Sequence, residues 1–455
     1  MHEKQRIHIY GFLIFLFAFL FLMGLEWLMQ PYASDGIYFQ GWSSEKLMQT
    51  VSIEDLRQAP LETLFYIHIQ PPGFDTLRAI LVAMWPSLDI RAALRHVDAS
   101  LYYLWAILFG LMGTLLFVWF SELIGLKAAI VASVLFLLHT ASIFYATLLE
   151  STFLSSLLIL YMYYLLWRIK RGHRVSMALF SIVILALFFF RSIFQLPALF
   201  VFTVSLILLK VPARKLLIFI LVTGGISGLY ILKQYYLFRL ISTSSFSGLN
   251  LINSIGLKRE HYPVYLEDPA NLKILDNHLP NTLTRLYKIN GEPNFNNINY
   301  LNLDRELVNN YLDKIRRMSV WDLSRSYLEN ARVYFMPSSS YSENVIVDRL
   351  PWRPVYDIVF SYPTLLILFL LAGTLSIRKT LQDQNYATSA ALILPGLYIF
   401  LVSILFDRGE NMRFKFFLEP VLFIFLAAQF YRAVQQFQQT VFRKGPTHPP
   451  STGLE

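Results

Sequence analysis

Stretches of apolar residues alternate with polar segments along the whole chain. A helix needs about 20 apolar residues to cross the hydrocarbon core of a bilayer. Ten stretches come near this length: Tyr10–Met29, Leu101–Glu122, Ala128–Thr147, Thr152–Trp167, Met177–Phe190, Ile193–Leu209, Leu216–Tyr235, Ile358–Leu375, Ala387–Phe406 and Phe414–Tyr431. The pattern predicts an all-α polytopic membrane protein with about ten transmembrane helices.

The composition agrees with this class. Hydrophobic residues make up 55% of the 455 residues and charged residues only 15%, whereas soluble domains carry about 25% charged residues. The net charge of +9 does not indicate nucleic-acid binding, since the basic residues lie in short loops between apolar stretches. The chain contains no cysteine, which excludes disulfides and thiolate chemistry.

Most basic residues of the short loops fall on one face if the ten stretches cross the membrane in turn, and the other face receives chiefly Arg191, Arg408, Arg413 and Lys415. The more basic face receives Lys4, Arg6, Lys127, Arg168, Lys170, Arg171, Arg174, Lys210, Arg214, Lys215, Arg378, Lys379, Arg432, Arg443 and Lys444. Short cytoplasmic loops carry such an excess of Lys and Arg. We therefore expect both termini in the cytoplasm. The first stretch is too long for a signal peptide and lacks a small-residue cleavage site, so we expect it to remain as a span.

This topology divides the chain into segments: an N-terminal transmembrane module 1–233 with a first external loop 30–100, an external segment 234–357, C-terminal transmembrane helices 358–431 and a cytoplasmic tail 432–455. Within the first loop, Ser44–Ala59 reads as an amphipathic helix and Asp75–Trp85 as a short apolar one. Such segments usually lie in the membrane interface. The external segment is longer than loops without secondary structure usually are, which predicts a small folded unit.

Polar clusters lie at the external ends of the apolar stretches. Asp35 follows the first span in the sequence Ser-Asp-Gly, His68 precedes Pro71-Pro72, and Glu150 and Arg191 lie between later spans. Each has a structural alternative: a turn or helix cap for Asp35 and Glu150, a first helical turn for the prolines and snorkelling for Arg191. Charges at membrane ends are costly and tend to mark function, so their gathering on one face predicts a single site.

The connection between the last two spans carries an unusual number of charges. Asp407, Arg408, Glu410, Arg413 and Lys415 all lie within nine residues. Arg binds a phosphate through its planar fork, and Lys binds it as a point charge. This loop is therefore a candidate site for an anionic lipid headgroup.

The order of these pieces resembles the GT-C membrane glycosyltransferases, in particular the bacterial branch similar to protein O-mannosyltransferases and the lipid A aminoarabinose transferase. The matching features are Asp35 and Tyr38 after the first span, a split His-Pro-Pro element (His68, Pro71 and Pro72), Arg91 or Arg95 before the second span, paired spans ending at Glu150, Arg191 to Pro197, and Arg413 to Pro420. The family often carries two adjacent acidic residues in the first loop. Here Gly36 follows Asp35, which favours a site without metal or other cofactor.

The resemblance implies a bacterial inner-membrane enzyme that transfers a sugar from a polyprenyl-phosphate carrier, with inversion, to an acceptor (protein, lipid or glycan) on the external face. In this hypothesis Asp35 is the general base and Glu150 orients the reacting groups. Arg191, Arg413 and Lys415 bind the donor phosphate, and Tyr38, His68 and Glu410 contact substrate. Two alternatives remain open at this point: a transporter or flippase of a lipid-linked saccharide, and a non-catalytic membrane scaffold.

Overall fold

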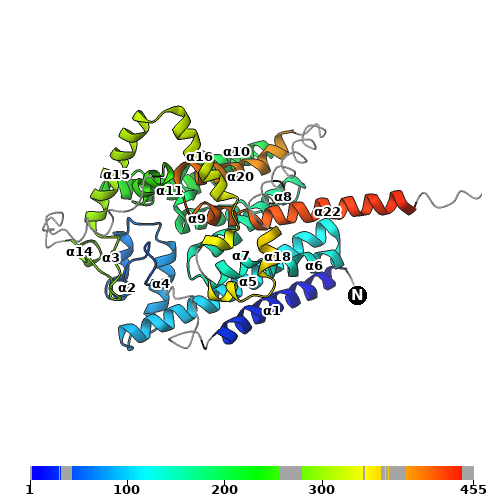
Figure 1. The fold of residues 1–455 in the computed structure, drawn as a ribbon, viewed down its shortest axis with the longest axis horizontal. Coiled ribbons are helices and arrows are strands. Elements are labelled where there is room, and N and C mark those ends of the chain that lie inside the picture. The colour runs from blue at the N-terminus through cyan, green and yellow to red at the C-terminus, as the bar shows by residue number, and fades with distance from the viewer. Residues whose placement is uncertain are drawn as a thin grey trace, which may run out of the picture.

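The computed structural model describes residues 3–29, 31, 44–256, 279–341, 344–359, 364, 367 and 386–442. These residues form helices joined by turns and contain no β-strand (Figure 1). The first half of the chain contains α1 (Glu3–Met29), α2 (Ile53–Gln58), α3 (Pro60–Phe65), α4 (Gly73–Ala83), α5 (Ile90–Ile124), α6 (Leu126–Leu137), α7 (Thr140–Thr147), α8 (Ser151–Lys170), α9 (Met177–Phe190), the 3₁₀ helix η2 (Ser192–Phe194), α10 (Leu196–Leu208) and α11 (Ala213–Phe238).

The second half continues with shorter helices and then long ones. They are α12 (Ser247–Ser254), α14 (Asn281–Thr284), α15 (Ile298–Arg317), α16 (Val320–Tyr334), the 3₁₀ helix η4 (Ser338–Tyr341), α17 (Val345–Asp348), α18 (Arg353–Val359), α20 (Tyr386–Phe406), α21 (Asn411–Phe416) and α22 (Glu419–Phe442). Among the described residues, α1, α5, α8, α11 and α20 are long and apolar enough to cross a membrane. The pair α6 and α7, bent by 57°, makes a sixth candidate if it is one span. Within the described residues the all-α prediction is confirmed, and the candidate spans support the prediction of a membrane-embedded protein.

The described residues contain fewer candidate spans than the ten that the sequence predicts. Helices α9 and α10 contain 14 and 13 residues, which is about 20 Å of helix against a hydrocarbon core of about 30 Å. The tenth stretch is divided into α21 and α22, with Pro420 in the first turn of α22, a position that proline favours. Most of the eighth stretch lies outside the described residues.

The first external loop differs from its prediction. Residues 44–52 form turns, and α2 begins only at Ile53. The Glu45 carboxylate accepts hydrogen bonds from the Ile53 N–H at 3.0 Å and the Ser52 hydroxyl at 3.1 Å, which holds this stretch in a turn. Four apolar side chains of the predicted Ser44–Ala59 helix are buried in the protein: Leu47, Val51, Ile53 and Leu56. The helix expected at Asp75–Trp85 is present as α4.

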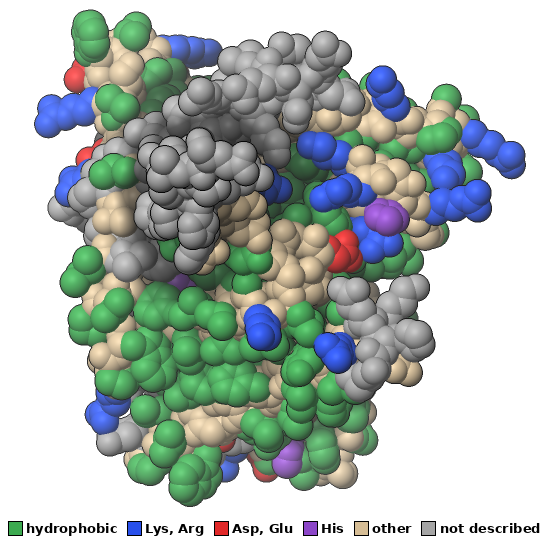
Figure 2. All heavy atoms as spheres, turned by 90° about the vertical axis from the view of Figure 1, so that its right-hand side faces the viewer, with side chains coloured by type: hydrophobic (Ala, Val, Ile, Leu, Met, Phe, Trp, Pro, Cys, Tyr) green, Lys and Arg blue, Asp and Glu red, His purple; other side chains and the backbone are tan. Residues whose placement is uncertain are grey.

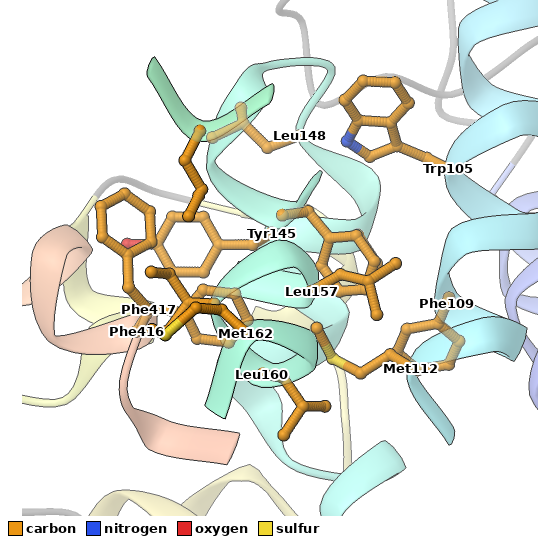
Figure 3. Packing of buried hydrophobic residues seen from close by; sticks show 14 of the residues in the cluster. Trp105, Phe109, Met112, Tyr145, Leu148, Leu157, Leu160, Met162, Phe416 and Phe417 are labelled. Atoms are coloured by element: carbon orange, nitrogen blue, oxygen red, sulfur yellow. The ribbon is translucent and has the colours of Figure 1, made fainter. Parts of the chain in front are cut away.

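One hydrophobic core runs through the molecule and includes residues from α1 to α22. Figure 3 shows part of it, where Tyr145 of α7 and Phe416 of α21 lie beside Leu157 and Met162 of α8. The rings of Tyr145 and Phe416 stack with centroids 4.4 Å apart. Helices that lie far apart in the sequence therefore pack together around α8.

The end of the molecule at which α1 begins lies to the right in Figure 1 and faces the viewer in Figure 2. Lys and Arg side chains are prominent on this face, and few Asp or Glu side chains are seen. Hydrophobic side chains cover much of the lower part of the same view. The cytoplasmic location of this end stays a prediction from the basic residues.

Candidate buried anion site

Glu150 lies in the extended turn between α7 and α8, with φ −138° and ψ 169°. It stands at the N-cap position of α8, but its side chain makes no capping hydrogen bond. The carboxylate instead lies between two guanidinium groups. Arg191 Nη2 is 3.3 Å from Oε1, and Arg413 Nη1 is 3.3 Å from Oε2. The structure thus favours an electrostatic role for Glu150 over the capping alternative.

Arg191 occupies the break between α9 and η2. Its backbone is extended (φ −144°, ψ 128°), and Pro197 stands in the first turn of α10 shortly afterwards. The side chain is buried, donates to the Thr152 hydroxyl, and lies over the Phe417 ring at 5.9 Å from its centroid. A buried guanidinium cannot snorkel to solvent, so the structure excludes the interfacial alternative for Arg191.

Arg413 lies in α21, at the start of the last helical segment. It pairs with Glu410 at 2.5 Å and donates to the Tyr341 hydroxyl at 3.2 Å. The Tyr341 ring also lies 5.1 Å from the guanidinium carbon. Asn411 fixes the preceding loop, because its side-chain amide donates to the carbonyls of Ser403 and Asp407 at 2.7 and 2.9 Å.

Lys415, also in α21, makes a second buried ion pair. Its ammonium lies 3.2 Å from Glu419 and donates to the Met336 carbonyl at 2.5 Å. The Ser338 hydroxyl also donates to Glu419, at 2.6 Å. Arg191, Glu150, Arg413 and Glu410 form one series of ion pairs, and Lys415 with Glu419 forms a separate buried pair. We call these six residues together the arginine cluster.

Burial changes the electrostatics of the two arginines. Burial and the neighbouring Arg413 guanidinium lower the pKa of Arg191 to about 10. Burial also acts to lower the pKa of Arg413, but the carboxylates of Glu410 and Glu150 outweigh it and raise that pKa above its ordinary value. Both side chains are therefore cationic at neutral pH, and each needs a negative partner inside the protein.

The arginine cluster also contains unsatisfied donors. Arg191 Nε and Arg413 Nε are buried without a hydrogen-bond partner among the described residues, as is one oxygen of Glu419. Leaving a buried donor unpaired costs about 1–3 kcal/mol. The Glu410 side chain is 25% exposed, whereas the other members are at most 10% exposed, so solvent reaches the cluster from the side of Glu410.

The remaining site candidates from the sequence lie elsewhere or cannot be placed. Asp35 and Tyr38 lie outside the described residues. His68 is fully buried, and its ring nitrogens contact the Ser245 hydroxyl at 2.8 Å and the Asn296 carbonyl at 2.9 Å. Burial lowers the pKa of His68 to about 3, so the ring is neutral and joins the first loop to the external segment. These contacts give no support to substrate binding by His68, which stays a prediction.

A second buried ionic group was missed from the sequence. Arg78 of α4 is fully buried and pairs with Glu45 at 2.5 Å and Asp75 at 2.7 Å. Lys288 lies beside them and donates to the carbonyls of Glu45 and Leu47 at 3.0 and 2.6 Å. An arginine inside the short apolar sequence of α4 was the available signal, since a buried charge requires partners. We call this group the Arg78 cluster.

A surface cavity of about 240 Å³ lies between α2, α3 and the start of α14. Its polar lining includes Asp55, Gln58, Glu62, Thr63, Asn281 and Thr282. Two carboxylates and no cation line this cavity, which suits hydroxyl groups better than a phosphate. It is therefore separate in character from the arginine cluster.

Within the part of the chain that the structure describes, no group of three or more acidic or histidine side chains is arranged to hold a metal ion. Because Asp35 is outside that part, the expectation of a metal-free site stays a prediction. No protein-family model matches the sequence, and no curated protein matches it.

Proposed function

We propose that the protein is an integral membrane glycosyltransferase that uses a polyprenyl-phosphate-linked sugar as donor. The observation that supports this most is the arginine cluster, in which two buried guanidinium groups share one carboxylate. A phosphate has the same planar bidentate complementarity to Arg as a carboxylate does. In this proposal a donor phosphate binds in the place of the Glu150 carboxylate, within reach of the Nε donors of Arg191 and Arg413.

The proposed reaction is a displacement at the anomeric carbon. The acceptor hydroxyl oxygen forms the new bond, its proton passes to the Asp35 carboxylate, and the bond between the anomeric carbon and the phosphate oxygen breaks with inversion. The leaving polyprenyl phosphate is a weak base and needs no general acid. Arg191, Arg413 and Lys415 would stabilise its negative charge in a region shielded from water.

Transfer can be tested directly with purified protein and a panel of radiolabelled polyprenyl-phosphate sugars. We expect transfer or hydrolysis with at least one donor. Asp35→Asn should lower the rate by about 10²–10⁴-fold, since general-base catalysis typically contributes this much. Asp313→Asn is the matched control, because Asp313 is exposed on α15 and pairs only with Arg316. An Asp35→Asn variant with the parental rate would refute the assignment of the base.

A transporter or flippase of a lipid-linked saccharide is the second candidate, and one observation favours it. The span formed by α6 and α7 is broken at Leu138 and His139 with a bend of 57°, and broken helices often mark substrate sites in transporters. Movement of a labelled donor lipid across proteoliposomes without chemical turnover would select this function. Turnover without movement would select the transferase. A protein that did neither would be a scaffold.

A further inference from the structure

The exposed face of α16 carries an alternating row of apolar and basic side chains. Trp321, Arg325, Leu328 and Arg332 follow the spacing i, i+4, i+7, i+11, which places them along one side of the helix. Trp321 is 84% exposed and Leu328 is 71% exposed. We call these four residues the α16 stripe. In Figure 1 the hairpin of α15 and α16 projects beyond the edge of the helix bundle.

The opposite side of α16 fixes its depth relative to a candidate span. Asn330 is fully buried, and its amide donates to the carbonyls of Ile404 and Ser254, both at 2.8 Å. Ile404 lies in the last turn of α20, one of the helices able to cross a membrane. The ring of Tyr334 contacts Phe400 of the same helix, with centroids 5.0 Å apart. Helix α16 is therefore docked at the end of a candidate span, and the end of a span is where hydrocarbon gives way to headgroups.

The charges of the hairpin suit an anionic partner. Five basic side chains lie between residues 312 and 332, against three acidic ones: Lys314, Arg316, Arg317, Arg325 and Arg332 against Asp313, Asp322 and Glu329. Arg325 makes no ion pair within the described residues. Basic residues near an anionic membrane surface contribute about 1 kcal/mol each, and Trp prefers the interfacial layer because its ring is amphipathic.

We propose that the α16 stripe lies on the membrane surface, with Trp321 and Leu328 inserted among anionic phospholipid headgroups and Arg325 and Arg332 bound to their phosphates. The spacing, the exposure of large apolar side chains and the docking of Asn330 at the end of α20 all lead to this placement. The proposal is independent of glycosyl transfer and holds equally for a transporter.

The depth of the stripe can be measured with nitroxide labels, because the protein contains no native cysteine. Trp321→Cys and Leu328→Cys would be labelled in the full-length protein in phosphatidylglycerol nanodiscs. Leu229→Cys, exposed on the candidate span α11, is the lipid-facing control, and Asn290→Cys, exposed in a turn, is the aqueous control. We expect oxygen to reach positions 321 and 328 more readily than a water-soluble nickel complex does, as at position 229.

Two results would overturn the membrane placement. One is nickel access at positions 321 and 328 equal to that at position 290. The other is shielding from both reagents, which would show that protein covers the stripe. The role of charge is tested by comparing phosphatidylglycerol with phosphatidylcholine nanodiscs. We expect the label at position 328 to lie deeper in the anionic lipid and Arg325→Gln to remove most of that difference. Equal depth in both lipids would refute the recognition of anionic headgroups.

Discussion

Removing the negative charge of Glu150 is the sharpest test of the arginine cluster. Glu150→Gln keeps the shape of the side chain and leaves Arg191 and Arg413 without their shared carboxylate. One nitrogen of each guanidinium group lies 3.3 Å from an oxygen of Glu150. At an effective dielectric constant of about 20, one such contact is worth about 5 kcal/mol before desolvation is counted. Breaking a buried pair from one side typically costs about 3–5 kcal/mol, which is the expected loss of unfolding free energy.

The matched control is Glu122→Gln. Glu122 lies 3.5 Å from Arg168, but both side chains are about one-third exposed. A solvent-exposed ion pair contributes at most about 1 kcal/mol. Thermal unfolding of the purified variants, followed by tryptophan fluorescence, compares the two substitutions directly. If Glu150→Gln and Glu122→Gln lowered the melting temperature equally, the reasoning about burial would be refuted.

The same variant tests whether the cluster binds phosphate. A phosphate that enters the site must displace the Glu150 carboxylate in the parent protein. In Glu150→Gln it meets Arg191 without its Glu150 partner and Arg413 paired with Glu410 alone among the described carboxylates. A short-chain polyprenyl phosphate at 100 times its dissociation constant stabilises a protein by about 2.7 kcal/mol. We expect the concentration that gives this stabilisation to be lower for Glu150→Gln than for the parent. Absence of stabilisation in both proteins would contradict an anion site here.

Two further predictions concern the supporting structure. Gly73→Ala should lower the free energy of unfolding by about 1–3 kcal/mol, because the new Cβ would lie 2.6 Å from the Phe189 carbonyl oxygen. Gly224→Ala is the control, since its Cβ meets no atom within 4 Å, and it should be neutral or stabilising. Denaturation of the purified variants compares the two. Burial raises the pKa of Asp304 from 3.8 to about 7. Between these two values the folded protein keeps a proton that the unfolded chain has lost. The free energy of unfolding should therefore fall by up to about 4 kcal/mol as pH rises from about 4 to about 7. Hydrogen exchange in α12 and α15 measures this, and Asp304→Asn should flatten the dependence; an unchanged slope would show that other groups cause it.

Much of the fold could be predicted because membrane helices leave a strong apolar pattern. The observed α9 has the same bounds as the predicted stretch Met177–Phe190. The first half of Ser44–Ala59 was predicted wrongly because its turn depends on Glu45, a local hydrogen-bond competitor that periodicity does not register. Among the described residues the count of spans falls short of the prediction where a helix is interrupted, as between α6 and α7.

The candidate site was predictable only in part. The sequence predicted that Glu150, Arg191, Glu410 and Arg413 gather on one face, and the structure places them in direct contact. It could not predict Tyr341, because that residue reaches Arg413 from a segment whose path depends on tertiary packing. Lys288 was missed for the same reason, since it reaches the first loop from a position over 200 residues away in the sequence.

The two buried ionic clusters differ in how many of their guanidinium nitrogens have a hydrogen-bond acceptor. In the Arg78 cluster every guanidinium nitrogen has an acceptor: Nε donates to the Ser44 hydroxyl, Nη1 to the Val51 carbonyl and Asp75, and Nη2 to Glu45. Such a satisfied network stabilises one arrangement of the chain. In the arginine cluster the Nε atoms of Arg191 and Arg413 are both left without an acceptor among the described residues. This difference supports the proposal of a ligand site at the arginine cluster, whereas the Arg78 cluster holds Ser44, the first described residue after the segment that contains Asp35.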